Sequence, residues 1–417
     1  MTETLVVVGG SLAGLRAVEA VRGDGWEGAV VLVGAEEHLP YDRPPLSKGY
    51  LSAEECPDPT YRDEDRITRE LGVDLVLGTA ASALDLDART VTVGERTVDY
   101  DALVLATGSY ARSLPGTDGL AGVFTVRTLD DARALRGALR EGTPKLTVVG
   151  GGFIGSELAS VGRALDLDVT VIERGPTLLA PAIGTSMGQA LTRLHERYGT
   201  RVLTGVQVDE VLGDHRVRAV RLSDGREIET DILIAGVGAA PATGWLEGSG
   251  LTVDDGVVAD ATLAAAPRVH VAGDIARWPN PLFDDVLDGP MRLQHWTTAA
   301  EQGARAARNA VAPSQTRPYE TVPYFWSDWY ASRIQFAGIS AADGHDVGVE
   351  VVAGDNTDGG PFTALYRAND RVIGALAVDM RAEVMKYRRL ISQRATWNAA
   401  LELAEARSSD RSVRPRL

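Results

Sequence analysis

A short apolar strand followed by a glycine turn and a helix occurs twice in this chain, and this repeat limits the fold more than any other feature. The first copy spans residues 4–22 and contains the turn Gly-Gly-Ser-Leu-Ala-Gly at 9–14. The second copy begins at Leu146 and runs into Gly-Gly-Gly-Phe-Ile-Gly at 150–155, which keeps all three glycines of the dinucleotide fingerprint. The glycines allow a tight turn, and the following helix binds a pyrophosphate at its N-terminus. The repeat therefore predicts an α/β protein with two Rossmann-like dinucleotide-binding domains.

An acidic residue follows each glycine turn at about the distance of a ribose-binding carboxylate. Glu36, with Glu37 directly after it, comes 22 residues after Gly14, and Glu173 comes 18 residues after Gly155. A carboxylate accepts hydrogen bonds from a ribose 2′-hydroxyl but repels a 2′-phosphate. Glu173 therefore predicts NAD rather than NADP as the ligand of the second copy.

Three further apolar strands end in glycine-containing turns, where the backbone can approach a bound dinucleotide closely. Residues 101–108 form an apolar strand that ends in Ala-Thr-Gly, and residues 269–274 end in Gly-Asp. Residues 231–241 run from another apolar strand into a glycine turn, which we interpret as the return to the first domain. Two dinucleotides in one enzyme imply that electrons pass between them, so the combination predicts an oxidoreductase.

The pattern changes after about residue 319, where short β runs replace the strand and helix alternation. Their length and spacing predict an antiparallel sheet, followed by two helices. An aromatic segment at 324–330 precedes the sheet, and we interpret it as core packing. The predicted strands are 333–337, 346–353, 362–367 and 371–378.

One helix is predicted from a local signal just before this region. Thr298 and Glu301 have the spacing of a capping box, which predicts a helix that starts there and runs to about Val311. Its positive N-terminal end would face the residues beside His295.

Charge and composition limit the partners of this 417-residue chain. The net charge of −16, from 42 basic and 58 acidic residues, disfavours nucleic acid and anionic membranes as partners. No apolar stretch approaches the roughly 18 residues needed to cross a bilayer. No leader precedes the first strand, so we expect a cytoplasmic protein. The six histidines show no metal-ligand spacing, so no metal is predicted.

Several motifs together resemble one family over essentially the whole chain. They are the glycine turn at 9–14, Tyr-Asp-Arg-Pro-Pro-Leu-Ser-Lys at 41–48, Ala-Thr-Gly at 106–108, Gly-Gly-Gly-Phe-Ile-Gly-Ser-Glu at 150–157, Gly-Asp at 273–274 and Phe-Trp-Ser-Asp at 325–328. With these motifs the chain resembles the FAD-dependent NADH:ferredoxin reductases of oxygenase systems. The resemblance implies hydride transfer from NADH to FAD, then single-electron transfers to an iron–sulfur ferredoxin that feeds a monooxygenase or dioxygenase.

The resemblance also implies three domains and a set of site residues. The domains are a discontinuous FAD-binding domain at 1–112 and 242–318, an NAD-binding domain at 113–241 and a C-terminal α+β domain at 319–417. The expected FAD contacts are Gly9, Ala13, Gly14, Glu36, Arg43, Pro45, Lys48, Ala81, Thr107, Gly108, Arg127, Asp274 and Trp296. The expected NADH contacts are Gly150, Gly152, Gly155 and Glu173, with Gly238 as a further cofactor contact. Lys48 paired with Glu157 is implied as the catalytic pair, in which the ammonium orients the flavin ring and counters charge on the reduced flavin.

Two positions depart from the family pattern. Ser11 replaces a glycine of the first turn, where the backbone normally approaches the pyrophosphate. Ala35 stands where relatives often carry an aspartate, so Glu36 is the expected ribose contact, with Glu37 as the alternative.

Cys56 is the only cysteine, and this separates the candidate enzyme classes. A pyridine-nucleotide disulfide reductase needs a cysteine pair beside the flavin, so that class is excluded. A single-cysteine NADH oxidase or peroxidase stays open, although its cysteine is expected near position 42, where this chain has Asp42. A non-enzymatic flavoprotein that signals through its redox state also stays open.

The implied ferredoxin predicts a locally basic docking surface. Ferredoxins of oxygenase systems are generally acidic, so an acidic reductase must concentrate positive charge where they meet. Residues 381–394 hold five basic residues against Glu383 alone, and Arg305 and Arg308 follow Thr298. We expect transient docking and a reductase that is a monomer or a weak dimer.

Overall fold

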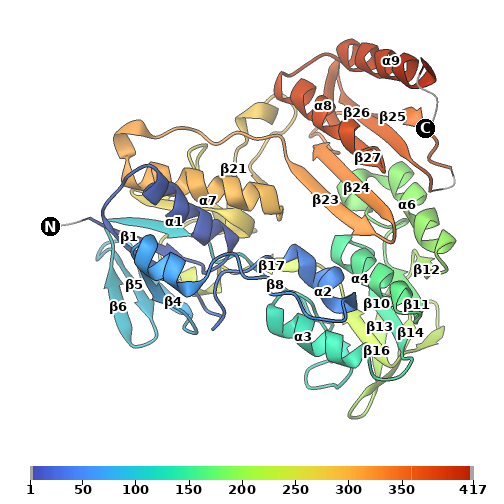
Figure 1. The fold of residues 1–417 in the computed structure, drawn as a ribbon, viewed down its shortest axis with the longest axis horizontal. Coiled ribbons are helices and arrows are strands. Elements are labelled where there is room, and N and C mark those ends of the chain that lie inside the picture. The colour runs from blue at the N-terminus through green and yellow to red at the C-terminus, as the bar shows by residue number, and fades with distance from the viewer. Residues whose placement is uncertain (1–2, 358, 414–417) are drawn as a thin grey trace. The chain divides into compact units, whose positions relative to one another are not determined.

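The computed structural model of the protein describes residues 3–357 and 359–413, and within them the chain folds into two compact units (Figure 1). The first unit contains the chain up to Asp42 together with Asp58–Tyr110 and Ala240–Pro323. The second contains Arg43–Pro57, Ala111–Ala239 and the chain from Tyr324 onward. Two short strands, β8 (Ser109–Ala111) and β17 (Ala239–Pro241), contain points where the chain passes between the units. The finer division into three domains stays a prediction.

The first unit is built on a six-stranded sheet in the order β19-β20-β7-β1-β2-β3. All neighbouring strands are parallel except β19 and β20. Because the sheet is covered on both faces, its central strands are continuous apolar runs rather than alternating ones. The strands are β1 (Thr4–Val8), β2 (Ala29–Val33), β3 (Val73–Val76), β7 (Ala102–Leu105), β19 (Ala264–Ala266) and β20 (Val269–Val271).

Two helices, α1 (Leu12–Gly23) and α7 (Trp296–Val311), cover one face of this sheet (Figure 1). They approach closely because Gly303 has no side chain: a Cβ there would lie 2.1 Å from the carbonyl oxygen of Ala13. A small antiparallel sheet covers the other face. Its strands are β4 (Ala81–Asp85), β5 (Thr90–Val93) and β6 (Arg96–Asp99). The unit also contains β18 (Val257–Val258), β21 (Ala276–Trp278), β22 (Met291–Arg292) and the short helices η2 (Arg66–Glu70), η3 (Gly244–Leu246), η4 (Gly273–Ile275), η5 (Pro281–Phe283) and η6 (Pro313–Gln315).

The second unit contains a five-stranded sheet that is parallel throughout, in the order β12-β11-β10-β16-β9. Its four main strands repeat the arrangement of β3-β2-β1-β7 in the first unit, as the two glycine motifs predict. The strands are β9 (Val123–Phe124), β10 (Lys145–Val149), β11 (Asp168–Glu173), β12 (Arg201–Thr204) and β16 (Ile232–Ala235). The helices of this part are η1 (Pro44–Ser47), α2 (Gly49–Ser52), α3 (Leu129–Ala138), α4 (Phe153–Ala164), α5 (Ala180–Ile183) and α6 (Thr185–Arg197), and β13 (Val208–Gly213), β14 (Val217–Leu222) and β15 (Glu227–Glu229) form a further antiparallel sheet.

The C-terminal part of the second unit is a five-stranded antiparallel sheet in the order β23-β24-β27-β26-β25. This confirms the predicted sheet, and it adds one strand, because the aromatic segment forms β23. A run of consecutive aromatic residues lacks the alternation that marks a half-buried strand. Two helices, α8 (Arg381–Ser392) and α9 (Trp397–Val413), pack against the sheet (Figure 1). The strands are β23 (Tyr324–Trp329), β24 (Ser332–Gly338), β25 (Val347–Gly354), β26 (Phe362–Ala368) and β27 (Arg371–Val378).

The capping box predicted for α7 is wrong. The helix begins at Trp296, with His295 as its N-cap, so Thr298 lies inside the first turn and is buried. Glu301 has tertiary partners instead, since its carboxylate accepts hydrogen bonds from the hydroxyls of Tyr319 at 2.8 Å and Thr321 at 3.0 Å. These contacts come from residues that are distant in sequence, so the local spacing was misleading.

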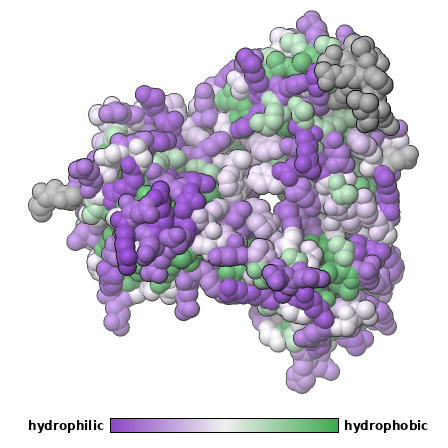
Figure 2. Space-filling view, in the orientation of Figure 1, coloured by the Kyte–Doolittle hydropathy of each residue, from purple (hydrophilic) through white to green (hydrophobic). Residues whose placement is uncertain are grey.

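Hydrophilic and apolar side chains are interspersed over the visible face of each unit (Figure 2). Among the residues that the structure describes, no helix has both the length and the apolar character needed to cross a membrane.

Candidate cofactor sites and a buried lysine–glutamate pair

The first glycine turn packs so closely that side chains are excluded from it. Gly9 has a φ of +137°, and a Cβ at this position would lie 2.1 Å from the carbonyl oxygen of Ala106. A Cβ on Gly14 would lie 2.0 Å from the carbonyl oxygen of Gly9. The end of β1, the first turn of α1 and the end of β7 therefore meet through backbone atoms, with Ala13 buried beside them. This geometry suits a pyrophosphate at the N-terminus of α1.

The second glycine turn is built in the same way. Gly150 has a φ of +102°, and a Cβ there would lie 2.2 Å from the carbonyl oxygen of Gly236. A Cβ on Gly155 would lie 2.1 Å from the carbonyl oxygen of Gly150. The two turns thus present the same backbone surface to a ligand, at α1 and at α4.

The comparison of the turns explains why Ser11 is tolerated. Ser11 is the N-cap of α1 as Gly152 is the N-cap of α4, and both have negative φ values of −128° and −77°. A Cβ on Gly152 would meet no atom within 4 Å. A side chain at this position therefore strains neither the backbone nor the packing of the protein.

The predicted ribose carboxylates are each held by neighbouring donors. Glu173, the last residue of β11, accepts hydrogen bonds from the backbone N–H groups of Gly151 and Gly175, both at 2.6 Å. Glu36 accepts a hydrogen bond from the Tyr41 hydroxyl at 2.6 Å and is half-buried, whereas Glu37 is exposed. The ordered position of Glu36 favours it over Glu37 as the ribose contact.

The Gly-Asp strand end is tied to the Ala-Thr-Gly strand end within the first unit. The Ser109 hydroxyl donates a hydrogen bond to the Asp274 carboxylate at 2.7 Å. Gly108, the residue before Ser109, has a φ of +72°. The hydroxyl of Thr107 donates a hydrogen bond to the carbonyl oxygen of Ala242 at 2.9 Å. The predicted FAD contacts Thr107, Gly108 and Asp274 therefore lie together. Ala81, another predicted FAD contact, is the first residue of β4 in the same unit.

Trp296 opens α7 and is fixed by two polar groups. Its indole N–H lies 2.9 Å from both the Asp42 carboxylate and the Tyr61 hydroxyl. Tyr61 in turn donates to Asp42 at 2.6 Å. Burial, and then the Asp42 carboxylate, raise the pKa of Tyr61, so the phenol stays neutral. Asp42, at the position where a single-cysteine enzyme is expected to carry its thiol, therefore serves as a hydrogen-bond acceptor.

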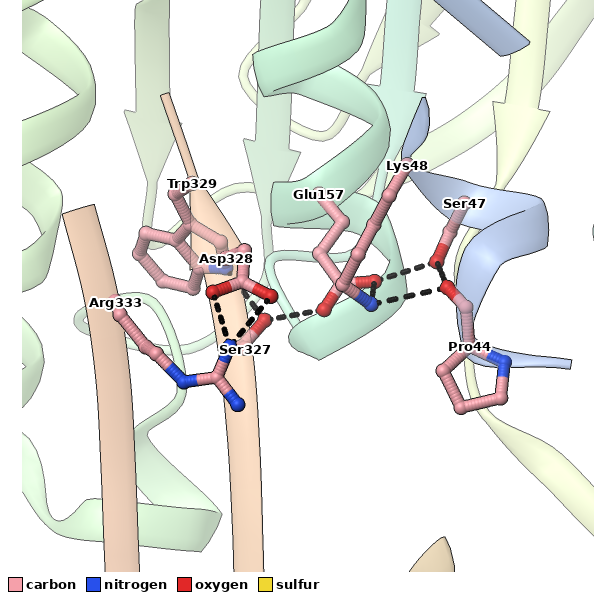
Figure 3. Close-up of polar contacts among 8 residues, drawn as sticks. All are labelled: Pro44, Ser47, Lys48, Glu157, Ser327, Asp328, Trp329 and Arg333. Atoms are coloured by element: carbon pink, nitrogen blue, oxygen red, sulfur yellow. Dashed lines mark hydrogen bonds and ion pairs between the residues drawn. The ribbon is translucent and has the colours of Figure 1, made fainter. Parts of the chain in front are cut away.

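The structure brings Lys48 and Glu157 together, as the resemblance implies (Figure 3). The ammonium of Lys48 lies 2.7 Å from Oε2 of Glu157 and 3.1 Å from the carbonyl oxygen of Pro44. The Ser47 hydroxyl donates to the same carboxylate oxygen at 2.5 Å. On the other side of the carboxylate, the Ser327 hydroxyl of β23 donates to Oε1 at 2.5 Å.

Glu157 is only 3% exposed, and its environment acts on its charge in two directions. Burial raises the pKa of Glu157 above its ordinary value, because the charged form is poorly solvated. The Lys48 ammonium and the hydroxyls of Ser327 and Ser47 oppose this shift. Each of these groups donates to the carboxylate, so the arrangement fits the ionised form of Glu157.

The proline-rich loop before Lys48 is held by contacts inside the second unit. A short helix, η1, contains Pro45, whose carbonyl oxygen accepts the backbone N–H of Lys48 at 3.0 Å. The Arg43 guanidinium donates to the carbonyl oxygen of Arg127 at 2.6 Å, which joins two more of the predicted contacts. Gly238 has a φ of +94° in the turn after β16.

Comparison with known proteins assigns the chain to a family. Residues 3–303 match the model of the pyridine nucleotide-disulphide oxidoreductase family, and residues 324–412 match the reductase C-terminal domain. The chain belongs to the pyridine nucleotide-disulphide oxidoreductase family. It is 36% identical over 402 residues to the ferredoxin–NAD(+) reductase component of the biphenyl dioxygenase system of Paraburkholderia xenovorans, covering 96% of this chain and 95% of that protein. It is 30% identical over 401 residues to putidaredoxin reductase of Pseudomonas putida, covering 94% and 92%.

A solved structure has the same fold over nearly the whole length. The covalent complex of putidaredoxin reductase with putidaredoxin matches with a TM-score of 0.88 and 29% identity, covering 98% of this chain and 99% of that chain. The predicted fold class and the resemblance to ferredoxin reductases are therefore confirmed. The protein is an oxidoreductase, and the predicted cofactors, FAD and NADH, are those of its family.

Several residues at these sites were missed by the sequence reasoning. Ser47 and Ser327 lie inside the quoted motifs, but nothing in their spacing predicts that they share Glu157. Tyr41, Tyr61 and Ser109 were missed because each acts on a residue brought near by the fold. The functional roles of the predicted site residues stay predictions.

Proposed function

We propose that this protein is an NADH:ferredoxin reductase that supplies electrons to an oxygenase. The observation that carries this is the occurrence, in one chain, of two similarly built glycine turns together with a buried lysine–glutamate pair. The chain offers no cysteine pair, and Cys56 is exposed. The names of its relatives agree, since one is a component of a biphenyl dioxygenase system and another is putidaredoxin reductase.

The first glycine turn, with Glu36 and Asp274, fits FAD, and the second, with Glu173, fits NADH. Bound FAD supplies the conversion of a two-electron hydride transfer into two single-electron transfers. By its resemblance to the family, Lys48 would supply a positive charge for the bound flavin, and Glu157 holds its ammonium. The N-terminal end of α7 adds a positive partial charge near Trp296. In this proposal the protein contributes orientation and electrostatic field, and no residue acts as a nucleophile.

We assign the docking surface for the ferredoxin to α8 and the residues after it, 381–394. The charge of Glu383 is already neutralised there, because Arg407 pairs with it at 2.8 Å and the carboxylate is buried. Arg381 and Arg389 are exposed, and Arg388 lies over the ring of Tyr324. Arg308 on α7 is a weaker candidate than the sequence suggests, because Asp24 pairs with it at 2.6 Å.

The decisive experiment is reduction of a purified [2Fe-2S] ferredoxin by the FAD-loaded protein. We expect NADH-driven reduction of the ferredoxin in the absence of any thiol reagent. A protein that consumes NADH only with oxygen or peroxide would belong to the single-cysteine oxidase class. A protein that binds NADH without turnover would favour the signalling flavoprotein. The cytoplasmic location and the monomeric or weakly dimeric state remain predictions from the sequence.

A further inference from the structure

The buried Glu157 is contacted by two segments that lie far from it in sequence, and one of them belongs to the C-terminal sheet. Ser47 and Lys48 reach one carboxylate oxygen from the proline-rich loop. Ser327 reaches the other oxygen from β23, across 170 residues of sequence. Figure 3 shows the carboxylate between these two segments. The C-terminal sheet therefore takes part directly in holding the ion pair.

The direction of the hydrogen bond from Ser327 is fixed by a third residue. The indole N–H of Trp329 lies 2.8 Å from the Ser327 oxygen, and an indole can only donate. Ser327 accepts that hydrogen bond, so its single hydroxyl proton is free to point at Glu157. Ser327 and Trp329 are fully buried, so water does not compete for these groups. Both oxygens of Glu157 therefore face donors, Oε1 the Ser327 hydroxyl and Oε2 the Ser47 hydroxyl and the Lys48 ammonium, and this favours the carboxylate over the protonated acid.

The strand that carries Ser327 is anchored to the helix that carries Glu157 at a second point. The backbone N–H of Tyr330 donates to the hydroxyl of Ser160 at 2.5 Å. Glu157 and Ser160 are three residues apart on α4, so they lie on the same side of the helix. The Tyr330 hydroxyl also lies 2.5 Å from Nδ1 of the buried His195 on α6. The end of β23 is thus held in register with α4, which fixes the position of the Ser327 hydroxyl.

We infer that Ser327 is a positioning residue that keeps Glu157 ionised and aligned with Lys48. Burial alone favours the neutral acid, and a hydrogen bond to a charged group opposes this more strongly than one between neutral groups. If the Ser327 hydroxyl is removed, Oε1 of the buried Glu157 carboxylate no longer accepts a hydrogen bond from β23. The protonation equilibrium of Glu157 then moves toward the neutral form by about tenfold, the lower end of what a charged hydrogen bond contributes. A neutral Glu157 holds the Lys48 ammonium less firmly.

The test compares Ser327→Ala and Ser327→Thr with Ser156→Ala as the matched control. Ser156 precedes Glu157 on α4, is fully buried, and its hydroxyl has no hydrogen-bond partner among the described residues. Its replacement removes a buried hydroxyl from the same helix without touching the carboxylate. Thermal unfolding of all three variants measures any general loss of stability.

Two readouts are followed from pH 5.5 to 9 in the FAD-loaded protein. They are kcat/KM for NADH with ferricyanide as acceptor, and the visible absorption spectrum of the resting flavin, which does not depend on turnover. For Ser327→Ala we expect the acid limb of both profiles to move to higher pH, with kcat/KM about tenfold lower on that limb and changed less than twofold at high pH. Ser327→Thr, which restores a hydroxyl, is expected to follow the wild type, as is Ser156→Ala.

Two outcomes overturn the inference. In one, the Ser327→Ala profiles superimpose on those of the control. In the other, kcat/KM falls equally at every pH, which indicates a structural role only. The inference rests on the proposed function through the role of Lys48, but the two fail separately. If wild-type protein reduces no ferredoxin, the proposed function fails, while the flavin spectrum still reports whether Ser327 controls Glu157.

Discussion

Replacing Glu173 by glutamine should change the nucleotide preference of this reductase while keeping the shape of the site. In the structure both carboxylate oxygens are held by backbone N–H groups, of Gly151 and Gly175, at 2.6 Å. Each oxygen keeps a further lone pair that can accept a ribose hydroxyl. Glutamine removes the negative charge, and its NH2 group cannot accept from a backbone N–H. One of the two backbone donors therefore loses its partner.

The size of the effect follows from the charge and the burial of this side chain. Two unit charges about 4 Å apart interact by about 4 kcal/mol at an effective dielectric constant of 20. Glu173 is half-buried, so solvent and salt reduce this, and we take roughly 1.4 to 2.7 kcal/mol for its repulsion of a 2′-phosphate. The ratio of kcat/KM for NADH to that for NADPH should therefore fall by about 10- to 100-fold in E173Q. Weaker NADH binding adds to this fall, because a charged acceptor for the ribose hydroxyl is lost.

The assay is ferricyanide reduction with varied NADH and NADPH, at low and high ionic strength. Ferricyanide is a small acceptor, so the measurement does not depend on ferredoxin docking. The matched control is E210Q, which removes a charge from an exposed glutamate on β13 of the same unit. We expect the control to keep the wild-type ratio. An unchanged ratio in E173Q, or a wild-type protein that uses both nucleotides equally, would refute the role of Glu173.

Three further predictions concern the thiol, the docking surface and acid stability. Cys56→Ser should leave NADH-driven ferredoxin reduction within about twofold, since the proposed transfer uses no thiol; a collapse of activity would contradict this. Arg389→Glu should raise the apparent KM for ferredoxin severalfold and flatten its salt dependence, with ferricyanide reduction unchanged; a parallel loss of both activities would place docking elsewhere. Burial lowers the pKa of His195 to about 3, so below pH 6.5 the unfolded chain binds a proton that the folded chain does not, and stability falls as pH falls. Between pH 6.5 and 5 this costs about 2 kcal/mol, and urea unfolding of H195Q should show a shallower pH dependence than wild type.

The parallel sheets were predictable because their signal is local. Runs such as residues 4–8 and 146–149 are apolar on both faces, and the glycine turn that follows each run marks where the strand ends. Predictions from the sequence were wrong or incomplete where tertiary contacts decide the structure. Glu301 has the spacing of a capping residue, but its partners Tyr319 and Thr321 lie 18 and 20 residues away. The aromatic run at 324–329 forms a strand because its side chains are divided between the C-terminal core and α4, which no periodicity in the run reveals.

The buried pair illustrates the same limit at the candidate site. Lys48 and Glu157 were paired through a family resemblance, and the structure agrees with that pairing. Composition and spacing alone predict neither residue's partner, because the proline-rich loop and α4 are separated by more than a hundred residues. The donor from Ser327 is more distant still, and a serine has no sequence signal that marks it as a ligand of a buried carboxylate.

The two glycine turns also explain why their acidic residues lie at different distances in the sequence. The register pairs Val8 with Val33 in the first copy and Val149 with Ile172 in the second, so Gly34 occupies the place of Glu173. Gly34 leaves room for the Leu77 side chain, whose Cδ2 would lie 2.8 Å from a Cβ at this position and would have to move for any larger residue.

In the first copy the proposed ribose carboxylate is that of Glu36, two residues later, and the Tyr41 hydroxyl donates to it. The connection from helix to strand is also longer in this copy, five residues at 24–28 against three at 165–167. These two differences of two residues account for the spacings of 22 and 18. Placing a glutamate at position 34 would consequently require the Leu77 side chain to move before its carboxylate could take the place that Glu173 has in the second copy.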